Sequence, residues 1–294
     1  MPVRPVVSDD LVVLHRLFSA LTSSLPHGFP PSLEEFSLSF TGTPLNHLVS
    51  QIFVAEKDGE IVGFARVGRY THVPDRWTLA REGDGLIFGP MILSGHREAG
   101  LQLLIAAEQF LTRYRSRLRL AFDPVEAVSI PFYNGGWCGL SEKLPEVVQV
   151  LALYGFRVRH REYCMTCREL PQDDPSEPDP PYYLQRSARD SYRYALKVFD
   201  RSTLVGSCYY SLMNPTTSQH PDAKFAGYIN GLSVQQDYQG RGLGRLLMCH
   251  SLSHLRELGC RQVCLTTGSE NYRAQNLYYS LRFALVDSTI TLTR

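Results

Sequence analysis

Alternating apolar and polar positions predict two β-hairpins, one in each half of the chain. Residues 52–67 form two apolar runs around Asp58-Gly59, a pair that favours a tight hairpin turn. Residues 194–210 show a second hairpin pattern with the same apolar-Val-Gly step. Because Ile61-Val62-Gly63 and Leu204-Val205-Gly206 lie 143 positions apart, the chain is predicted to contain an internal repeat.

The same elements follow in each half. Strands are predicted at 85–93, 118–122, 225–234 and 262–267. A helix with apolar residues at spacings of three and four follows the first strand of each pair, and a second helix follows the second strand. Gly100 and Gly242, in the loops before the first helices, are 142 positions apart, and we take them as equivalent. This order predicts an α/β fold, with a mixed sheet flanked by helices in each half.

A segment rich in proline and acidic residues separates the two halves. Residues 171–181, PQDDPSEPDPP, contain nothing that packs a core and are typical of an extended linker. The predicted organisation is therefore a first domain at 1–170, a linker at 171–181 and a second domain at 182–294.

Composition narrows the class of ligand and the location. The 294 residues carry a formal net charge of +1, which argues against nucleic acid or an anionic membrane as a partner. The sequence contains no run of about 18 apolar residues, the length that a membrane span needs. The N-terminus does not resemble an export signal, and seven irregularly spaced cysteines fit reduced thiols. We expect a cytoplasmic protein with a small-molecule ligand.

The six residues Gln239–Gly244 carry the clearest chemical signal. They leave a predicted strand and enter a helix, and their alternate glycines at 240, 242 and 244 remove the Cβ atoms that would hinder a close ligand. The first N–H groups of the helix lie at the positive end of its dipole, so a diphosphate is predicted to bind there. Neither a Walker loop nor the G-x-G-x-x-G dinucleotide pattern fits the spacing.

Two motifs in order resemble the GNAT N-acetyltransferases, which bind acetyl-coenzyme A. The first is Q-x-x-G-x-G, carried by Gln239, Gly242 and Gly244. The second is N-x-x-A-x-x-L-Y-x-x-x-G-F, matched by Asn271, Ala274, Leu277, Tyr278 and Phe283. Arg282 stands where the family has Gly, so we expect a distorted end to the last helix. The resemblance implies a tandem pair of GNAT domains.

The resemblance also implies residue roles. In the family, the fourth and fifth strands splay apart and coenzyme A lies between them. The cofactor-binding residues would then be Leu232, Ser233, Val234, Gln239, Gly240, Arg241, Gly242, Leu243, Gly244 and Asn271. Tyr278 would protonate the departing thiolate. Asn271 also fits a simple helix cap, a role that asparagine often takes.

The N-terminal half resembles a degenerate copy. Arg97 and Gly100 fit the loop motif, but Gln102 replaces its last small residue and Glu98 brings a carboxylate to the phosphate position. Leu151 stands at the tyrosine position. We therefore expect a single active site in the C-terminal half.

The C-terminal half is short at its start. Only residues 182–191 precede its hairpin, where a full family domain has two helices that wall the acceptor pocket. We expect the extra N-terminal segment 131–138 to supply that wall.

Other candidate chemistry stays weaker or open. His250 and His254 have a zinc-compatible spacing but no third ligand, and Cys164 and Cys167 lie in a predicted strand that points them to opposite faces, so no metal is predicted. The predicted strand 225–234 lacks a carboxylate, which leaves the general base open. Tyr228 and Asn230 could hold a water there, and Glu270 or a residue of the N-terminal half could accept the proton.

The function favoured by the sequence is an N-acetyltransferase that moves an acetyl group from acetyl-CoA to a primary amine of a small molecule by direct attack. The alternative is a non-catalytic acyl-CoA-binding or assembly module. The lack of a carboxylate in the predicted strand 225–234 and the presence of Arg282 in place of Gly favour this alternative.

Overall fold

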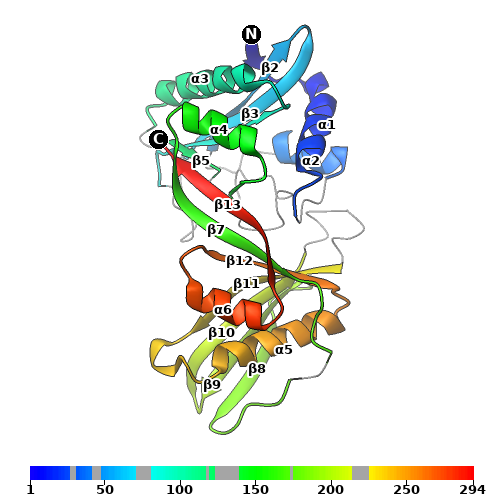
Figure 1. The fold of residues 1–294 in the computed structure, drawn as a ribbon, viewed down its shortest axis with the longest axis vertical. Coiled ribbons are helices and arrows are strands. Elements are labelled where there is room, and N and C mark those ends of the chain that lie inside the picture. Colours follow the sequence, from blue (N-terminus) through cyan, green and yellow to red (C-terminus); the bar gives the residue numbers. More distant parts are fainter. Residues whose placement is uncertain are drawn as a thin grey trace. The chain divides into compact units, whose positions relative to one another are not determined.

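A computed structural model describes residues 1–26, 31–41, 48–70, 81–116, 119–122, 139–172, 175–213 and 225–294. The chain forms two compact units (Figure 1). Unit 1 contains Met1–Glu162 and Asp287–Arg294, and unit 2 contains Tyr163–Val286. Each unit has a mixed sheet with helices packed on it, which confirms the predicted α/β class.

Unit 1 opens with strand and helix, then builds its sheet. Its elements are β1 (Val3–Pro5), η1 (Ser8–Asp10), α1 (Leu11–Thr22), α2 (Leu33–Thr41), β2 (Leu48–Lys57), β3 (Glu60–Tyr70), β4 (Gly85–Ile92), α3 (Arg97–Arg113), β5 (Arg119–Ala121), β6 (Leu140–Ser141), α4 (Pro145–Leu153) and the start of β7 (Arg157–Cys167). Strands β1 to β4 pair antiparallel in sequence order, and β4 pairs parallel with β5. The parallel pair requires α3 as its crossover.

Unit 2 repeats this order without the two early helices. Its elements are β8 (Tyr182–Ala188), β9 (Arg193–Asp200), β10 (Thr203–Leu212), β11 (Ala226–Val234), η3 (Gln236–Tyr238), α5 (Leu243–Glu257), β12 (Gln262–Gly268), α6 (Tyr272–Ser280) and the start of β13 (Ala284–Thr293). Strands β8 to β11 pair antiparallel and β11 pairs parallel with β12. A turn over residues 189–192 joins β8 to β9, so the predicted lack of two helices at this point is confirmed. The strand β8 itself was not foreseen.

Both predicted hairpins are present, and both turns use left-handed residues. Between β2 and β3, Asp58 and Gly59 have φ values of +52° and +84°, as a type I′ turn requires. The repeated Val-Gly step has a packing reason. A Cβ at Gly63 would lie 2.8 Å from Ile92 Cγ2, and one at Gly206 would lie 3.1 Å from the Ser233 carbonyl oxygen. Each hairpin therefore needs glycine at the same place.

The two halves of the chain exchange their last strands. β7 belongs to unit 1 up to Glu162 and to unit 2 from Tyr163, and β13 returns to unit 1 at Asp287. In unit 1, β13 pairs antiparallel with β5 and β6. In unit 2, β7 pairs with β12. The division of the structure thus differs from the predicted ranges 1–170 and 182–294, because a strand that continues into the other unit leaves no mark in composition.

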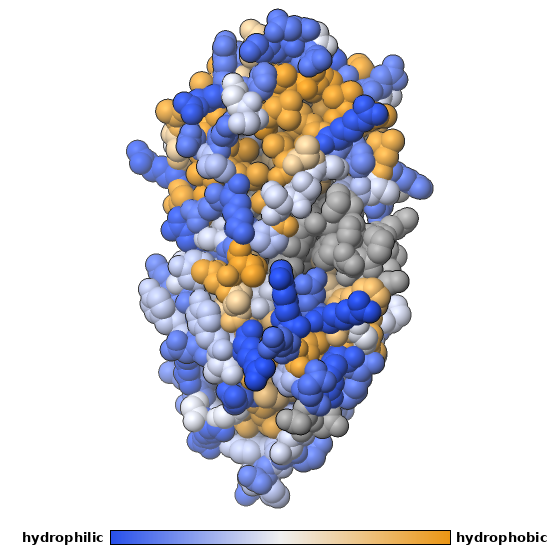
Figure 2. Space-filling model, turned by 45° about the vertical axis from the view of Figure 1, so that its right-hand side comes forward, coloured by the Kyte–Doolittle hydropathy of each residue, from blue (hydrophilic) through white to orange (hydrophobic). Residues whose placement is uncertain are grey.

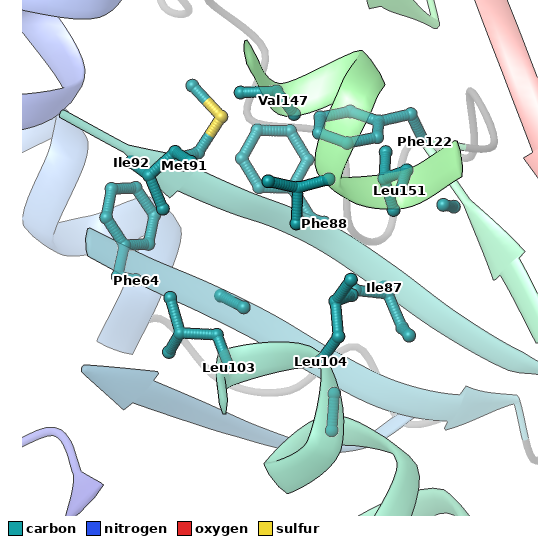
Figure 3. Packing of buried hydrophobic residues seen from close by; sticks show 14 of the residues in the cluster. Phe64, Ile87, Phe88, Met91, Ile92, Leu103, Leu104, Phe122, Val147 and Leu151 are labelled. Atoms are coloured by element: carbon teal, nitrogen blue, oxygen red, sulfur yellow. The ribbon is translucent and has the colours of Figure 1, made fainter. Parts of the chain in front are cut away.

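The cores follow this exchange. The unit 1 core brings strand residues such as Phe64 and Ile87 against Leu103 and Leu104 of α3 (Figure 3), and Ile290 and Leu292 of β13 belong to the same cluster. The unit 2 core likewise includes residues from the N-terminal half of the sequence, namely Met165, Cys167 and Leu170.

Hydrophilic side chains cover much of the face in Figure 2, with hydrophobic residues gathered toward its top. Among the described residues, no helix combines the length and the apolar composition of a membrane span.

The last helices of the two units end alike, although one ends with glycine and the other with arginine. Gly155 and Arg282 both take left-handed backbone, with φ values of +97° and +64°. In each unit the next residue closes the helix: Phe156 N donates to the Leu151 carbonyl, and Phe283 N donates to the Tyr278 carbonyl, both at 3.0 Å. The distortion expected at Arg282 is therefore absent. The hydrogen-bonded cap is kept, and the backbone of Arg282 adopts a left-handed conformation that glycine takes at lower cost.

We expect Arg282→Gly to raise the free energy of unfolding by about 0.5–1 kcal/mol, because glycine removes the left-handed strain. The exposed contact of Arg282 Nη1 with Glu169 Oε2, at 3.1 Å, adds little to set against this gain. Urea denaturation of the purified chain measures the change. The mirror variant Gly155→Arg should shift the midpoint in the opposite direction, and an unchanged or lower midpoint for Arg282→Gly contradicts the strain argument.

Candidate functional site

Two parallel strands of unit 2 separate part of the way along their length. β11 and β12 are paired from Ala226 and Gln262 to Ile229 and Leu265. β11 then continues to Val234 beside β10 alone. From Asn230 onward, β11 therefore presents an edge that β12 does not pair, which confirms the splay that the sequence resemblance implied.

A β-bulge marks the point of separation. Tyr209 pairs with Gly231 and Tyr210 pairs with Ile229, so Asn230 is an extra residue on β11. Such bulges bend a strand and redirect its backbone groups. Two residues before Asn230, the Tyr228 hydroxyl and the Thr266 hydroxyl lie 3.0 Å apart, a hydrogen bond that joins β11 to β12.

Alternation along β11 decides which of its backbone groups face the opening. Gln235 N donates to the Val205 carbonyl at 2.8 Å, so residue 235 faces β10. Successive residues of a strand alternate, which turns the backbone groups of Val234 and Leu232 to the open edge and those of Ser233 to β10. The structure therefore favours Leu232 and Val234 over Ser233 as contacts for a ligand between the strands.

The glycine loop lies directly after β11. Gly240 and Gly242 have φ values of +80° and +81°, and an added Cβ at either would meet no atom within 4 Å. The backbone conformation requires glycine here, while the space above both residues stays open. Gly244 differs, because its Cβ would touch Leu277 Cδ2 of α6 at 3.5 Å.

The start of α5 provides donors beside this open space. Its first intrahelical bond runs from Leu246 N to the Gly242 carbonyl at 3.0 Å. The N–H groups of Leu243, Gly244 and Arg245 precede that bond and have no carbonyl within the helix. Together with the helix dipole, such free N–H groups are the kind of arrangement that can bind an anion.

Side chains of the loop are held by neighbouring elements. Gln239 Nε2 donates to the Val234 carbonyl at 2.9 Å, and Arg273 Nη1 of α6 donates to Gln239 Oε1. Arg241 Nη2 donates to the Asp237 carbonyl at 3.0 Å, and its guanidinium lies over the Tyr238 ring. The loop thus has a fixed shape and a positive surrounding, although Arg273 was not among the sequence candidates.

Tyr278 lies in α6 and is 7% exposed, within the unit 2 core. Burial raises the pKa of its phenol to about 12, so the group keeps its proton at neutral pH. Leu277, the preceding residue, touches the loop at Gly244, which sets the helix against the start of α5. At the N-terminus of α6, Asn271 Oδ1 accepts from Ala274 N at 3.3 Å. Asn271 therefore caps the helix, and its contact with a cofactor stays a prediction.

The remaining candidates fall into several groups. Glu270 is exposed. His250 and His254 bond separate partners, the Ser176 carbonyl and the Tyr210 hydroxyl. Cys164 and Cys167 are buried in β7. In the part of the chain that the structure describes, no group of three potential ligand side chains forms a metal site. The segment 131–138, expected to wall the acceptor pocket, lies outside the described residues.

Packing corrects the predicted equivalence of the two loops. A Cβ at Gly100 would lie 2.9 Å from Val150 of α4, just as Gly244 faces Leu277 of α6. Gly100 therefore corresponds to Gly244, and the match with Gly242 is wrong because the unit 1 loop is two residues shorter. Glu98, within the first turn of α3, then occupies the position of Gly242.

Buried Leu151 stands at the Tyr278 position of unit 1, as expected. Unit 1 thus lacks both the open glycine pair and the phenol.

Unit 2 has the architecture of the α/β acyltransferases that hold a thioester donor between two splayed strands. The model of the acetyltransferase (GNAT) family matches residues 162–283. A mycothiol acetyltransferase of Cellulomonas flavigena is 41% identical over an alignment that covers 95% of this chain and 83% of the relative. The chain belongs to the GNAT acetyltransferase family.

Other relatives match over shorter stretches. A mycothiol acetyltransferase of Saccharopolyspora erythraea is 36% identical over 36% of this chain, and the match spans only 32% of that protein's length. A tandem GNAT protein from the clavulanic acid biosynthesis pathway has a similar fold, with a TM-score of 0.68 at 14% identity, covering 100% of this chain and 98% of the other. The tandem architecture inferred from the repeat thus recurs in a solved structure.

Proposed function

We propose that the chain is an N-acetyltransferase that transfers an acetyl group from acetyl-CoA to the primary amine of a small molecule. The observation that carries the proposal is the combination in one unit of separated strands, an open glycine loop at a helix N-terminus and a buried protonated tyrosine. Unit 1 lacks the last two features, so the proposal assigns a single active site to unit 2.

The loop would hold the diphosphate of the donor. The N–H groups at the start of α5 donate to phosphate oxygens, and the absence of Cβ atoms at Gly240 and Gly242 lets those oxygens approach the backbone. The open edge of β11 at Leu232 and Val234 offers backbone groups to the amides of the pantetheine arm. These contacts bind and orient the donor, since none of them reaches the reacting carbonyl.

Tyr278 would act as the general acid. The amine nitrogen attacks the thioester carbonyl carbon, a C–N bond forms, and the C–S bond breaks as Tyr278 gives its proton to the sulfur. The nitrogen loses a proton in turn. Tyr228, hydrogen-bonded to Thr266 where the strands part, would position a water that accepts this proton.

The acceptor is proposed from the relatives. Several of them are named mycothiol acetyltransferase, so the amine whose acetylation gives mycothiol is the first acceptor to test. The alternative function, a non-catalytic acyl-CoA-binding or assembly module, is favoured by the absence of a carboxylate on β11.

Turnover with this amine tests the acceptor directly. We expect release of free thiol from acetyl-CoA, followed with a thiol reagent, to depend on the amine and to give one acetylated product by mass spectrometry. A panel of amino acids, aminoglycosides and peptides serves as the comparison. Donor binding by calorimetry without turnover on any amine would support the binding module instead.

Gly242→Ala tests the loop against a matched control. Gly259, at the end of α5, also has a positive φ (+90°) and open space around a Cβ, so Gly259→Ala carries the same backbone strain of about 1 kcal/mol. Both variants should lose similar stability, but only Gly242→Ala should weaken CoA binding, by tenfold or more in calorimetry. Equal affinities in the two variants would remove the loop from the binding site.

Tyr278→Phe tests the acid. We expect kcat to fall by about 10² to 10⁴ when chemistry is rate-limiting, because the thiolate must then leave without a proton donor. Because the pKa of Tyr278 is raised to about 12, its titration should not appear in the pH-rate profile between pH 6 and 9. Its exposed neighbour supplies the control Tyr279→Phe, which should keep wild-type kcat. An unchanged kcat in Tyr278→Phe would exclude the role.

A further inference from the structure

The two copies of the fold give each residue of the last helix a counterpart. Val150 of α4 and Leu277 of α6 pack against Gly100 and Gly244, which fixes the alignment of helix and loop in both units. In that alignment, Glu146 corresponds to Arg273, both in the first turn of their helices.

In unit 1, the carboxylate of Glu146 occupies the loop. Ser94 Oγ donates to Glu146 Oε1 at 2.5 Å, and Gly95 N donates to Glu146 Oε2 at 2.9 Å. These two bonds lower the pKa of Glu146, with a smaller contribution from Arg97 and His96. An internal anion thus takes backbone and hydroxyl donors of the loop, as a bound anion would.

In unit 2, the same helix position contacts its loop with the opposite charge. Arg273 Nη1 donates to Oε1 of Gln239, in the loop that leads into α5. Gln239 Nε2 in turn donates to the Val234 carbonyl at 2.9 Å, at the end of the open edge of β11. Among the described residues, the Arg273 side chain donates one hydrogen bond, through Nη1. Most of the five N–H donors of its guanidinium therefore remain for a ligand.

Building on the proposed function, we infer that Arg273 contacts the diphosphate of the acyl donor and that the inverted charge at Glu146 closes the corresponding loop of unit 1. A guanidinium beside the glycine loop adds charge-assisted bonds to the phosphate oxygens. A carboxylate at this helix position repels a diphosphate and already engages the Ser94 hydroxyl and the Gly95 N–H group of the loop. This helix position therefore adds to the loop glycines in distinguishing the copy that binds the donor from the copy that does not.

Binding of three ligands to Arg273→Gln tests this inference. Glutamine keeps an amide donor for Gln239 but removes the charge. We expect the Kd for CoA to rise by about tenfold to a hundredfold, and its dependence on salt concentration to become weaker. The Kd for dephospho-CoA, which retains the diphosphate, should rise by a similar factor. Pantetheine, which has no diphosphate, should bind wild type and variant alike.

Controls separate the possible failures. Arg282→Gln removes the same charge at the other end of α6 and should leave the Kd unchanged, whereas Arg273→Lys should keep most of the affinity. If wild type does not bind CoA, the proposed function fails. If wild type binds CoA and Arg273→Gln binds it equally well, the inference about Arg273 is overturned. If Arg273→Gln weakens the binding of CoA but not of dephospho-CoA, Arg273 contacts the 3′-phosphate instead. If the variant weakens the binding of pantetheine by the same factor, the role of Arg273 is purely structural. Either result overturns the assignment.

Discussion

The separation of β11 from β12 is the feature on which the site depends. Four rungs of parallel pairing are followed by a strand that keeps only its antiparallel neighbour. Backbone donors and acceptors left without a partner are costly unless water or a ligand satisfies them. The bulge at Asn230 stands where the pairing with β12 ends, so the unpaired edge is part of the fold of the chain itself. An extended molecule with amides and a diphosphate would satisfy both the edge and the adjoining helix N-terminus.

Because the fold is duplicated within the chain, unit 1 and unit 2 can be compared position by position. Both units keep the hairpin, the glycine that admits a close strand contact, the crossover helix and a left-handed cap on the last helix. They differ where chemistry would take place: Leu151 against Tyr278, Glu98 against Gly242, and Glu146 against Arg273. Packing positions are conserved between the copies because a change there leaves a cavity or a clash. The positions to which the proposal gives chemical roles in unit 2 carry apolar or acidic residues in unit 1.

The sequence predicted the parts of this fold that rest on local rules. The Asp58-Gly59 turn, the amphipathic helices and the glycine loop all depend on neighbouring residues, and all three predictions match the structure. The equivalence of Gly100 and Gly242 failed because spacing alone does not reveal a two-residue deletion, whereas contacts with Val150 and Leu277 do. Arg273 was missed because its role depends on a residue 34 positions away. The exchange of β7 and β13 was missed because pairing between distant strands has no sequence signature.

That exchange means that residues 182–294 alone do not contain the whole of unit 2. Met165 and Cys167 fill its core from β7, and β7 also pairs with its strand β12, which forms one wall of the opening. A chain cut within 171–181 would separate unit 2 from these residues, exposing apolar surface and the far edge of β12. Conversely, unit 1 would lose Ile290 and Leu292 of β13. Each core therefore contains residues from the other half of the sequence, so each unit needs both halves of the chain to be complete.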